Sequence, residues 1–433
     1  MRYSAAGSGE TPAAEALRDN AISLVLFLCM AFALLLRFTV SPQLMNLVVN
    51  YTTESGSFYE KLHFGTDAIF LLAPIVLFSR PILLAGDEIG KFKALLVYSA
   101  VMLFLVPFLF ITGRAGSSGF VIDTYLVAGT AGLMTLAMRP EVRRALGDVI
   151  LAMLILSAVI GLAEALTRTR LLPYSLNELE FRPIGLSAHP LALGALCMLG
   201  SGFVPLTRWP VWVRVGSIFV LFIGCAASGA RTALLLNTAQ ILALLMFTRW
   251  PQLSLRHERQ AKLITLAATA VGGTALTAAL FSLGLLNRFN GTIFDENFMA
   301  RVTIYQVFTY VGWGDILFGM NANDLLAIVN QKLHLPYIES APVVIILLFG
   351  LPIAIVFSFM IFWLPFRLLA GAPLQAKLAT IAFLLASLSN NALSSKAPEM
   401  AMIVVLLLAY GGSSRPPRYR SEGHSTSSLP VQA

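Results

Sequence analysis

The sequence predicts an all-α, polytopic membrane protein, and three observations support this expectation. Hydrophobic residues make up 57% of the 433 residues and charged residues only 12%, whereas soluble domains contain about 25% charged residues. Apolar windows recur along the chain at lengths that suit membrane-spanning helices of about 20 residues. The basic residues, which give a formal net charge of +8, are scattered between these windows. They form no basic patch, so we expect no nucleic-acid partner.

About twelve apolar windows suit transmembrane helices, and together they make one integral membrane domain over residues 21–412. The first follows a short N-terminal segment, residues 1–20, which we expect to be cytoplasmic. It continues past Ala31-Phe32-Ala33, so we interpret it as an uncleaved anchor rather than a signal peptide. In chain order the windows are residues 21–40, 66–85, 94–112, 120–138, 148–166, 185–206, 211–228, 231–248, 263–286, 341–363, 378–394 and 398–412.

The seventh and eighth windows form one nearly continuous apolar run, residues 211–248. A single straight helix of that length would be about 57 Å long, against a hydrocarbon core of about 30 Å. The run must therefore break. The segment from Ser228 to Arg231 is the candidate, because Gly229 relaxes the backbone and a guanidinium needs an aqueous or protein-lined site.

The distribution of positive charge predicts that both termini are cytoplasmic. In that orientation 19 of the 30 Lys and Arg residues fall in cytoplasmic segments, as the positive-inside rule expects. The longest connection, residues 287–340, then lies outside. Helical spacing of apolar residues from Phe298 onward and over residues 322–335 predicts two short helices, so this loop is expected to form a cap on the outer membrane face. The tail, residues 413–433, is expected to be disordered.

The sequence predicts no metal site and no cofactor. Cys29, Cys197 and Cys225 all fall inside apolar windows, so no disulfide framework is visible. We find neither a phosphate-binding glycine loop nor a His/Glu cluster with metal-ligand spacing. Metal-independent chemistry, or no chemistry, is the expectation.

Four short stretches converge on the predicted outer side of the membrane. They are residues 181–190, residues 228–232, residues 301–305 followed by 317–319, and residues 339–340 with Gly350. Taken singly, most have an ordinary explanation, since Arg182 and Arg301 could be interfacial side chains, His189 a helix cap and Glu339 an interfacial charge. Arg231 is harder to explain, because it lies at the tip of two spans with no acidic neighbour in sequence.

The order of these stretches resembles the O-antigen ligase and polymerase superfamily of bacterial envelope glycosyltransferases. In that family R-x-x-G followed by H-P opens one span, and S-x-S-R marks the break between two later spans. An outer loop then carries an Arg motif and leads into H-[N/S/Q]-x9-G at the next span. The matching residues here are Arg182, Gly185, His189, Pro190, Ser228, Arg231, Arg301, Gly319, Glu339, Ser340 and Gly350.

Two positions depart from the family pattern. Ala230 replaces the second Ser of S-x-S-R, and Glu339 occupies the position of a His that characterises the ligase branch. The resemblance therefore favours a Wzy-type polysaccharide polymerase over a ligase that transfers glycan to another acceptor. His334, five residues before Glu339, is a further candidate for the missing His.

The resemblance implies a GT-C-like helical fold and a polyprenyl-diphosphate-linked oligosaccharide as donor, with a second such molecule as acceptor. Chain growth would take place on the periplasmic face of the bacterial inner membrane, with chain-length regulator and export proteins as further partners. Arg182, Arg231 and Arg301 are the candidates for binding the diphosphate, because a guanidinium binds phosphate oxygens bidentately.

The same chemistry needs a base for the attacking sugar hydroxyl. Glu339 ranks first, because partial desolvation at the membrane boundary would raise the pKa of its carboxyl group toward neutrality. His334 and His189 are the alternatives, and His189 is also a candidate for substrate binding. Tyr305 could stack on a sugar ring, although a place in the interfacial aromatic belt explains it equally well.

A transporter of lipid-linked sugar is the main alternative from another functional class. Transporters tend to have repeated halves and polar residues near mid-membrane. Here we find no repeat, the intramembrane ionisable residues that we identify are only Asp123 and Glu164, and the motifs lie on one face. These features favour chemistry at the membrane surface over transport.

Overall fold

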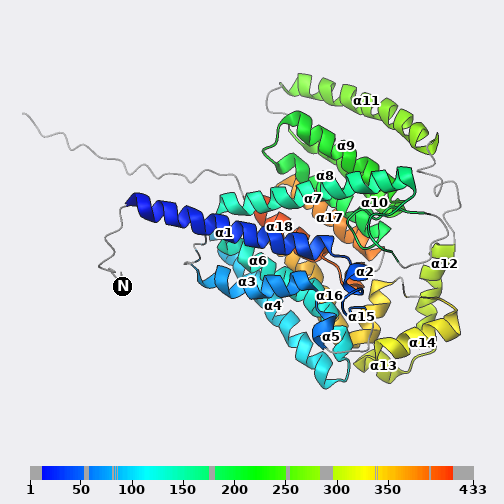
Figure 1. The fold of residues 1–433 in the computed structure, drawn as a ribbon. Coiled ribbons are helices and arrows are strands. Elements are labelled where there is room, and N and C mark those ends of the chain that lie inside the picture. The colour runs from blue at the N-terminus through cyan, green and yellow to red at the C-terminus, as the bar shows by residue number, and fades with distance from the viewer. Residues whose placement is uncertain are drawn as a thin grey trace, which may run out of the picture.

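The computed structural model describes residues 12–52, 58–79, 82, 84, 86–174, 181–249, 254–282, 296–336, 338, 340–389 and 392–412. All regular secondary structure in these residues is helical, which confirms the all-α prediction. The α-helices (Figure 1) are α1 (Pro12–Thr39), α2 (Pro42–Met45), α3 (Phe64–Phe78), α4 (Gly86–Ile111), α5 (Ala115–Phe120), α6 (Val127–Ala137), α7 (Pro140–Thr167), α8 (Pro190–Phe203), α9 (Val211–Ala227), α10 (Arg231–Phe247), α11 (Leu255–Ser282), α12 (Glu296–Thr303), α13 (Trp313–Phe318), α14 (Ala322–Leu333), α15 (Ala341–Phe349), α16 (Leu351–Leu368), α17 (Leu374–Leu388) and α18 (Glu399–Tyr410).

Short segments of other helix types connect or interrupt these helices. The 3-10 segments are η1 (Phe58–Lys61), η3 (Val204–Leu206), η5 (Ile304–Thr309) and η6 (Ala392–Ser394). A π-helical segment, η2 (Val121–Leu126), joins α5 to α6, so that Ala115–Ala137 forms one continuous apolar helix. Short π-helical segments inside α-helices are rare and frequently lie at functional sites.

Every predicted apolar window overlaps a helix. Among the described residues, five helical segments are long and apolar enough to cross a membrane: Ala16–Thr39, Gly86–Ile111, Ala115–Ala137, Pro140–Thr167 and Leu351–Leu368. Six shorter apolar helical segments accompany them, Phe64–Phe78, Pro190–Leu206, Val211–Ala227, Arg231–Phe247, Leu374–Leu388 and Glu399–Tyr410. The structure is therefore an all-helical bundle with several long apolar helices, which is the architecture of a multi-pass membrane protein.

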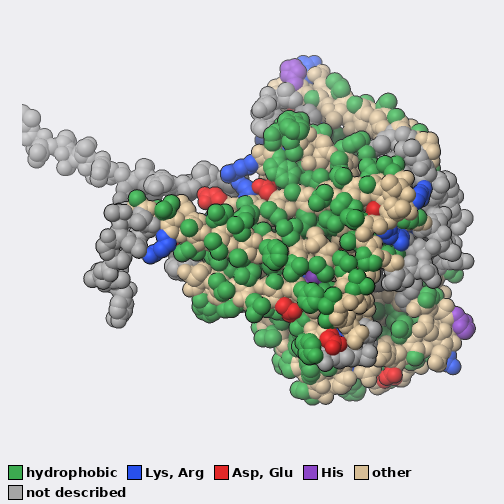
Figure 2. All heavy atoms as spheres, in the orientation of Figure 1, with side chains coloured by type: hydrophobic (Ala, Val, Ile, Leu, Met, Phe, Trp, Pro, Cys, Tyr) green, Lys and Arg blue, Asp and Glu red, His purple; other side chains and the backbone are tan. Residues whose placement is uncertain are grey.

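The outer surface of the bundle is apolar where a lipid-facing surface would be. Figure 2 shows hydrophobic side chains spread over the middle of the face, with charged side chains gathered mainly toward its ends. Leu71 on α3, Phe104 on α4 and Ile355 on α16 are each more than half exposed. An exposed apolar surface on this scale marks a contact with lipid or with another protein.

Helix α18 forms the centre of the bundle, where Figure 1 places it among the other helices. All of its residues from Glu399 to Tyr410 are buried, and α6, α7, α8, α16 and α17 pack around it. A helix that is apolar on every side is stable only when it is surrounded in this way. Because α18 is enclosed, its first residue, Glu399, is held inside the protein.

The predicted break in residues 211–248 is confirmed. Helix α9 ends at Ala227 and α10 begins at Arg231, and Gly229 between them has a positive φ of 66°. A second break was not predicted. The window 341–363 is interrupted at Gly350, which separates α15 from α16 and has a φ of 81°.

Three other boundaries differ from the sequence prediction. Residues 12–20, assigned to the N-terminal segment, are the first turns of α1. The window 185–206 becomes helical only at Pro190. Helix α11 begins at Leu255, eight residues before its predicted window, and its first turns contain Arg256, Arg259 and Lys262.

The cap, residues 296–340, contains the two predicted helical regions. The first is divided into α12 and η5, and the second, α14, begins one residue after Asn321, as expected. Buried Ile304, Leu325 and Val329 of the cap form an apolar cluster with Val343 and Leu347 of α15. The cap is therefore fixed to the helical bundle by packing, although residues 287–295 of the predicted loop lie outside the described residues.

Two glycines join the cap to the break between α15 and α16. Gly319 has φ 82° and ψ 165°, a region that only glycine adopts readily. A Cβ atom on Gly319 would overlap Nη1 of Arg114 and lie 2.8 Å from the backbone nitrogen of Gly350. A Cβ atom on Gly350 would in turn overlap the carbonyl oxygen of Leu317. The two backbones can approach only because both residues lack a side chain.

We expect Gly319→Ala to lower the free energy of unfolding by about 2 kcal/mol or more, because it adds steric overlap to an unfavourable φ/ψ. Thermal unfolding of the purified protein measures the effect. Gly216→Ala on α9 is the matched control, since no heavy atom lies within 4 Å of its added Cβ. An equal loss for both variants would show that the contact between Gly319 and Gly350 does not hold the cap.

Candidate functional site

A buried carboxylate shapes the loop that precedes α8. Glu164, near the end of α7, accepts hydrogen bonds at Oε2 from the backbone N–H groups of Ile184 and Gly185, both at 2.8 Å. Its Oε1 accepts one from Leu171 at 2.9 Å. Gly185 has a positive φ of 56°, and a Cβ atom there would lie 2.8 Å from Oγ of Ser157. Glu164 and Gly185 explain why residues 185–189 do not continue helix α8 as predicted.

The first two sequence motifs lie in direct contact. Nε of Arg182, which is buried, donates a hydrogen bond to the carbonyl oxygen of Ser228 at 3.1 Å. The carbonyl oxygen of Arg182 accepts from Nε and Nη2 of Arg170, at 3.1 and 2.9 Å. Arg170 also lies over the rings of Tyr174 and Phe181. Arg182 is thus held on both its side chain and its backbone.

Close packing between α8 and the helix break places Arg231 beside the Arg182 loop. A Cβ atom on Gly194 of α8 would lie 2.5 Å from Cβ of Ala230 and 2.7 Å from Oγ of Ser228. Oγ of Ser228 accepts from the N–H of Ala230 at 3.2 Å, and Arg231 then begins α10. The buried Ala230, which departs from the family pattern, fits this confined space.

His189 has the capping role that its position before Pro190 suggested. It is the N-cap residue of α8, and its Nδ1 accepts the backbone N–H of Leu191 at 3.2 Å. Its carbonyl oxygen accepts from Oγ of Ser187 at 3.1 Å. His189 also lines the cavity described below, so capping and substrate contact are compatible for this residue.

The candidates in the cap are more dispersed. Arg301 lies on α12, which packs against η5. Tyr305 is 51% exposed, and its hydroxyl oxygen lies 3.4 Å from Oγ of Ser340. His334 is exposed at the end of α14 with a φ of 55°. Glu339, ranked first as the base, lies outside the described residues. The roles of these four residues stay predictions.

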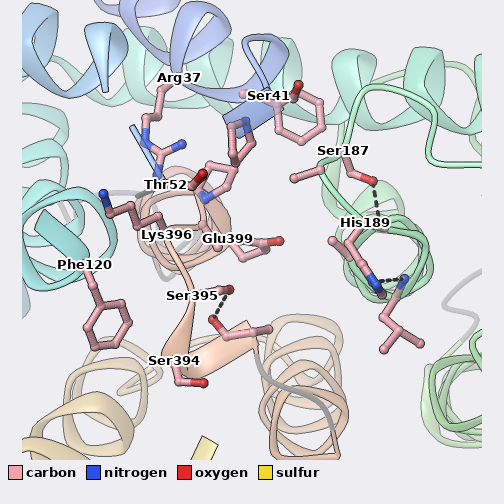
Figure 3. Close-up of a pocket in the computed structure, with 18 of the residues that line it drawn as sticks. Arg37, Ser41, Thr52, Phe120, Ser187, His189, Ser394, Ser395, Lys396 and Glu399 are labelled. Atoms are coloured by element: carbon pink, nitrogen blue, oxygen red, sulfur yellow. Dashed lines mark hydrogen bonds between the residues drawn. The ribbon is translucent and has the colours of Figure 1, made fainter. Parts of the chain in front are cut away.

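A cavity of about 420 Å³ lies where several helix ends meet. The C-terminal end of α1, the N-terminal end of α8 and the segment from Ala392 to Glu399 surround it, and Ala322 of the cap and Val344 and Leu348 of α15 also line it. Figure 3 shows Arg37, Lys396 and Glu399 on one side of the cavity and His189 with Ser187 on the other. Of the predicted site residues, His189 is among those that line it.

The π-helical segment η2 anchors the charged side of this cavity. The carbonyl oxygen of Asp123 accepts from Nη2 of Arg37 at 3.0 Å. The carboxylate of Asp123 accepts from the hydroxyl of Tyr51 at 2.8 Å and from the N–H of His63 at 3.1 Å. Nζ of Lys396 donates to the carbonyl oxygen of Tyr51 at 2.7 Å and lies over its ring. Asp123 therefore has a structural role, as does Glu164.

His63 fixes the corner between α1 and α3 as a neutral ring. Burial, with a smaller contribution from Arg37, lowers the pKa of His63 to about 3. Its Nδ1 accepts the N–H of Gly65 at 3.0 Å, so Nε2 carries the proton and donates to the carbonyl oxygen of Val40 at 2.8 Å. This arrangement holds the end of α1 against α3.

Comparisons with known proteins supply no assignment for this site. The chain matches no protein-family model, and a search of curated proteins finds no relative. The candidate function therefore rests on the motifs and on the geometry described above.

Sequence reasoning missed the charged residues of the cavity, although a signal was present. Arg37 lies inside the first apolar window and Glu399 inside the last, and an ionisable residue inside a membrane-spanning segment is by default a candidate functional residue. The sequence analysis expected few ionisable residues inside the membrane domain. Among the described residues, the buried charged side chains are those of Arg37, Lys61, Lys91, Arg114, Asp123, Arg143, Glu164, Arg182, Glu258 and Glu399.

We expect Glu164→Gln to lower the free energy of unfolding by about 2 kcal/mol, because an amide places N–H groups against backbone N–H donors. Hydrogen exchange at Ile184 and Gly185 should accelerate in the same variant. Glu141→Gln, at an exposed position on the same helix, is the control. Unchanged exchange at these two amides would contradict the role of Glu164 in holding the loop.

Proposed function

We propose that this protein is a membrane glycosyltransferase of the polysaccharide polymerase type. It joins polyprenyl-diphosphate-linked oligosaccharide repeat units on the periplasmic face of the bacterial inner membrane. The observation that carries the proposal is the hydrogen bond from Arg182 to the carbonyl oxygen of Ser228. This bond connects the R-x-x-G and H-P loop to the S-x-S-R break, two motifs that are separated in sequence and together define the resemblance.

The arrangement of helix ends supports a site on one face of the membrane. With a cytoplasmic N-terminus and about twelve spans, the C-terminal end of α1 and the N-terminal ends of α8, α10 and α18 all lie on the periplasmic side. The cap lies there as well. Residues of α1, α8, α18 and the cap line the cavity. The Arg182 loop leads directly into α8.

The proposed reaction needs little beyond binding, charge stabilisation and one proton transfer. The hydroxyl oxygen of the acceptor sugar attacks the anomeric carbon of the donor, and the bond from that carbon to the diphosphate oxygen breaks. The diphosphate leaves with the bonding electron pair, and the hydroxyl proton passes to a protein base. Direct displacement of this kind inverts the anomeric centre.

The arginines and one acidic or imidazole group divide these tasks. Arg182, Arg231 and Arg301 bind the diphosphate and stabilise the negative charge that develops on it, in place of a divalent cation. Glu339 is the first candidate for the base, and His334 is the second. The Glu at position 339 favours polymerase over ligase, because the ligase branch is characterised by His there.

We expect Arg231→Ala to reduce polymer formation by about 100-fold, because it removes a positive charge that acts on the leaving diphosphate. The variant is expressed in a strain that lacks the native copy, and its lipid-linked and polymeric glycans are separated by size. Single repeat units should accumulate on lipid at the periplasmic face. Arg208→Ala, at an exposed position between α8 and α9, should leave the product unchanged.

Other results in the same assay would contradict the proposal in distinguishable ways. Polymer of normal length that stays unattached to its acceptor would indicate a ligase. Lipid-linked units trapped on the cytoplasmic side would indicate a transporter. Normal polysaccharide from the Arg231 variant would contradict the proposed diphosphate site.

A further inference from the structure

The cavity contains two buried charges of opposite sign that the sequence motifs do not include. Arg37 lies near the C-terminal end of α1 and is 3% exposed, and Glu399 opens α18 and is 5% exposed. Both line the cavity, and Figure 3 shows Arg37 extending from α1 toward Lys396, with Glu399 between Lys396 and His189. Neither residue belongs to the motifs of the proposed diphosphate site.

Arg37 is oriented by the protein but not fully satisfied by it. Its Nη2 donates to the carbonyl oxygen of Asp123, whose own carboxylate is fixed by Tyr51 and His63. Its Nε is buried and has no hydrogen-bond partner among the described residues. A guanidinium held in one orientation with a buried donor left over is suited to bind an anionic oxygen.

Glu399 has a buried acceptor atom without a donor. Its Oε2 is buried and has no hydrogen-bond partner in the described part of the chain. The position of Glu399 is set by α18, whose remaining residues are all enclosed by other helices. A carboxylate oxygen in this environment needs a donor, and burial without one is unfavourable.

The two charges do not satisfy each other. No ion pair within 4.0 Å joins Arg37 to Glu399, although both line the same cavity and each has an unsatisfied polar atom. A buried polar atom without a partner opposes folding, so the stability of the fold alone does not explain either position. The geometry instead leaves room for a ligand that accepts from Arg37 and donates to Glu399.

We propose that this cavity binds the sugar–phosphate junction of a lipid-linked glycan. Nε of Arg37 donates to a phosphate oxygen, and Oε2 of Glu399 accepts a hydrogen bond from a hydroxyl of the attached sugar. The assignment of the lipid-linked glycan rests on the proposed function. The cavity is a second polar contact region for that substrate, formed by α1 and α18 rather than by the motif arginines.

The remaining lining suits a molecule with sugar and lipid character. The cavity of about 420 Å³ lies in the range of about 300–1,000 Å³ that is usual for small-molecule sites. Hydroxyl side chains that can exchange hydrogen bonds with a sugar line it: Ser41, Thr52, Ser117, Ser187, Ser394 and Ser395. Apolar Phe38, Leu191, Leu196 and Leu348 complete the wall.

The test measures binding by the full-length protein in phosphatidylcholine nanodiscs. Two probes are compared, farnesyl diphosphate and farnesyl diphosphate linked to glucose. Arg37→Gln should weaken binding of both probes about tenfold, because it removes a contact to phosphate. Glu399→Gln should weaken binding of the glucose-linked probe about tenfold and leave farnesyl diphosphate unchanged, because it replaces a charged acceptor for the sugar hydroxyl by a weaker, neutral amide oxygen.

Matched variants separate ligand binding from folding. Arg37→Lys keeps the positive charge but loses the Nε–H donor, and it should weaken both probes in a folded protein. Glu399→Gln is isosteric and removes an unpaired buried charge, so its thermal midpoint should stay the same or rise. Arg139→Gln, at a partly exposed residue that pairs with Asp19 at 2.8 Å, should bind both probes like the unmodified protein.

Three outcomes would overturn the inference. Unchanged binding of both probes by folded Arg37→Lys and Glu399→Gln would show that neither residue touches the ligand. A lower thermal midpoint with unchanged binding would show a purely structural role. Equal competition by phosphatidylglycerol would show that the site takes a phospholipid headgroup rather than a sugar phosphate.

Failure of this inference and failure of the proposed function give different results. If Arg231→Ala abolishes polymer while the Arg37 and Glu399 variants bind and polymerise normally, only the inference is wrong. If the probes bind through Arg37 and Glu399 while Arg231→Ala makes normal polymer, the site stands and the polymerase proposal is wrong.

Discussion

In an apolar helical bundle, each buried charge has to be satisfied by other groups of the protein, and the fold depends on this constraint. Glu164 meets it by accepting three backbone N–H groups, which shapes the loop before α8. Asp123 meets it through Tyr51 and His63, which fixes the corner of α1, α3 and η2. At Arg37 and Glu399 one buried polar atom each has no hydrogen-bond partner in the part of the chain that the structure describes, and both residues line the cavity.

The same elements that satisfy the structural charges also hold the residues that line the cavity. Asp123 holds the guanidinium of Arg37 through its carbonyl oxygen, so the network at η2 supports the site directly. The enclosed helix α18 fixes Glu399, and the contact between Gly319 and Gly350 fixes the cap beside α15. An unsatisfied buried polar group opposes folding by about 1–3 kcal/mol. Two such groups line one cavity, which supports the ligand proposed there.

Much of the fold could be predicted from the sequence, because apolar windows report directly on buried or lipid-facing helices. The break before Arg231 followed from length alone, since one helix would have exceeded the bilayer. The break at Gly350 could not be predicted in this way, because it depends on the backbone of the cap approaching from 31 residues earlier at Gly319. The late start of α8 likewise depends on the tertiary contact of Glu164 with residues 184 and 185.

The candidate site was predicted less completely. The motif order predicted that Arg182, His189 and Arg231 lie on one side of the protein. In the structure Arg182 contacts Ser228, just before Arg231, and His189 lines the cavity. Arg37 and Glu399 lie in the first and last windows, and only the tertiary fold brings these two residues to one cavity. Pairwise proximity of this kind has no local sequence signal.

The most direct test is a cryo-EM structure of the protein in a nanodisc with a polyprenyl-diphosphate-linked repeat unit. We expect density for a phosphate beside Arg37 and for a sugar beside Glu399, in the cavity next to the cap. An empty cavity, with the lipid-linked unit bound at the opposite ends of α1 and α18, would contradict the proposed site.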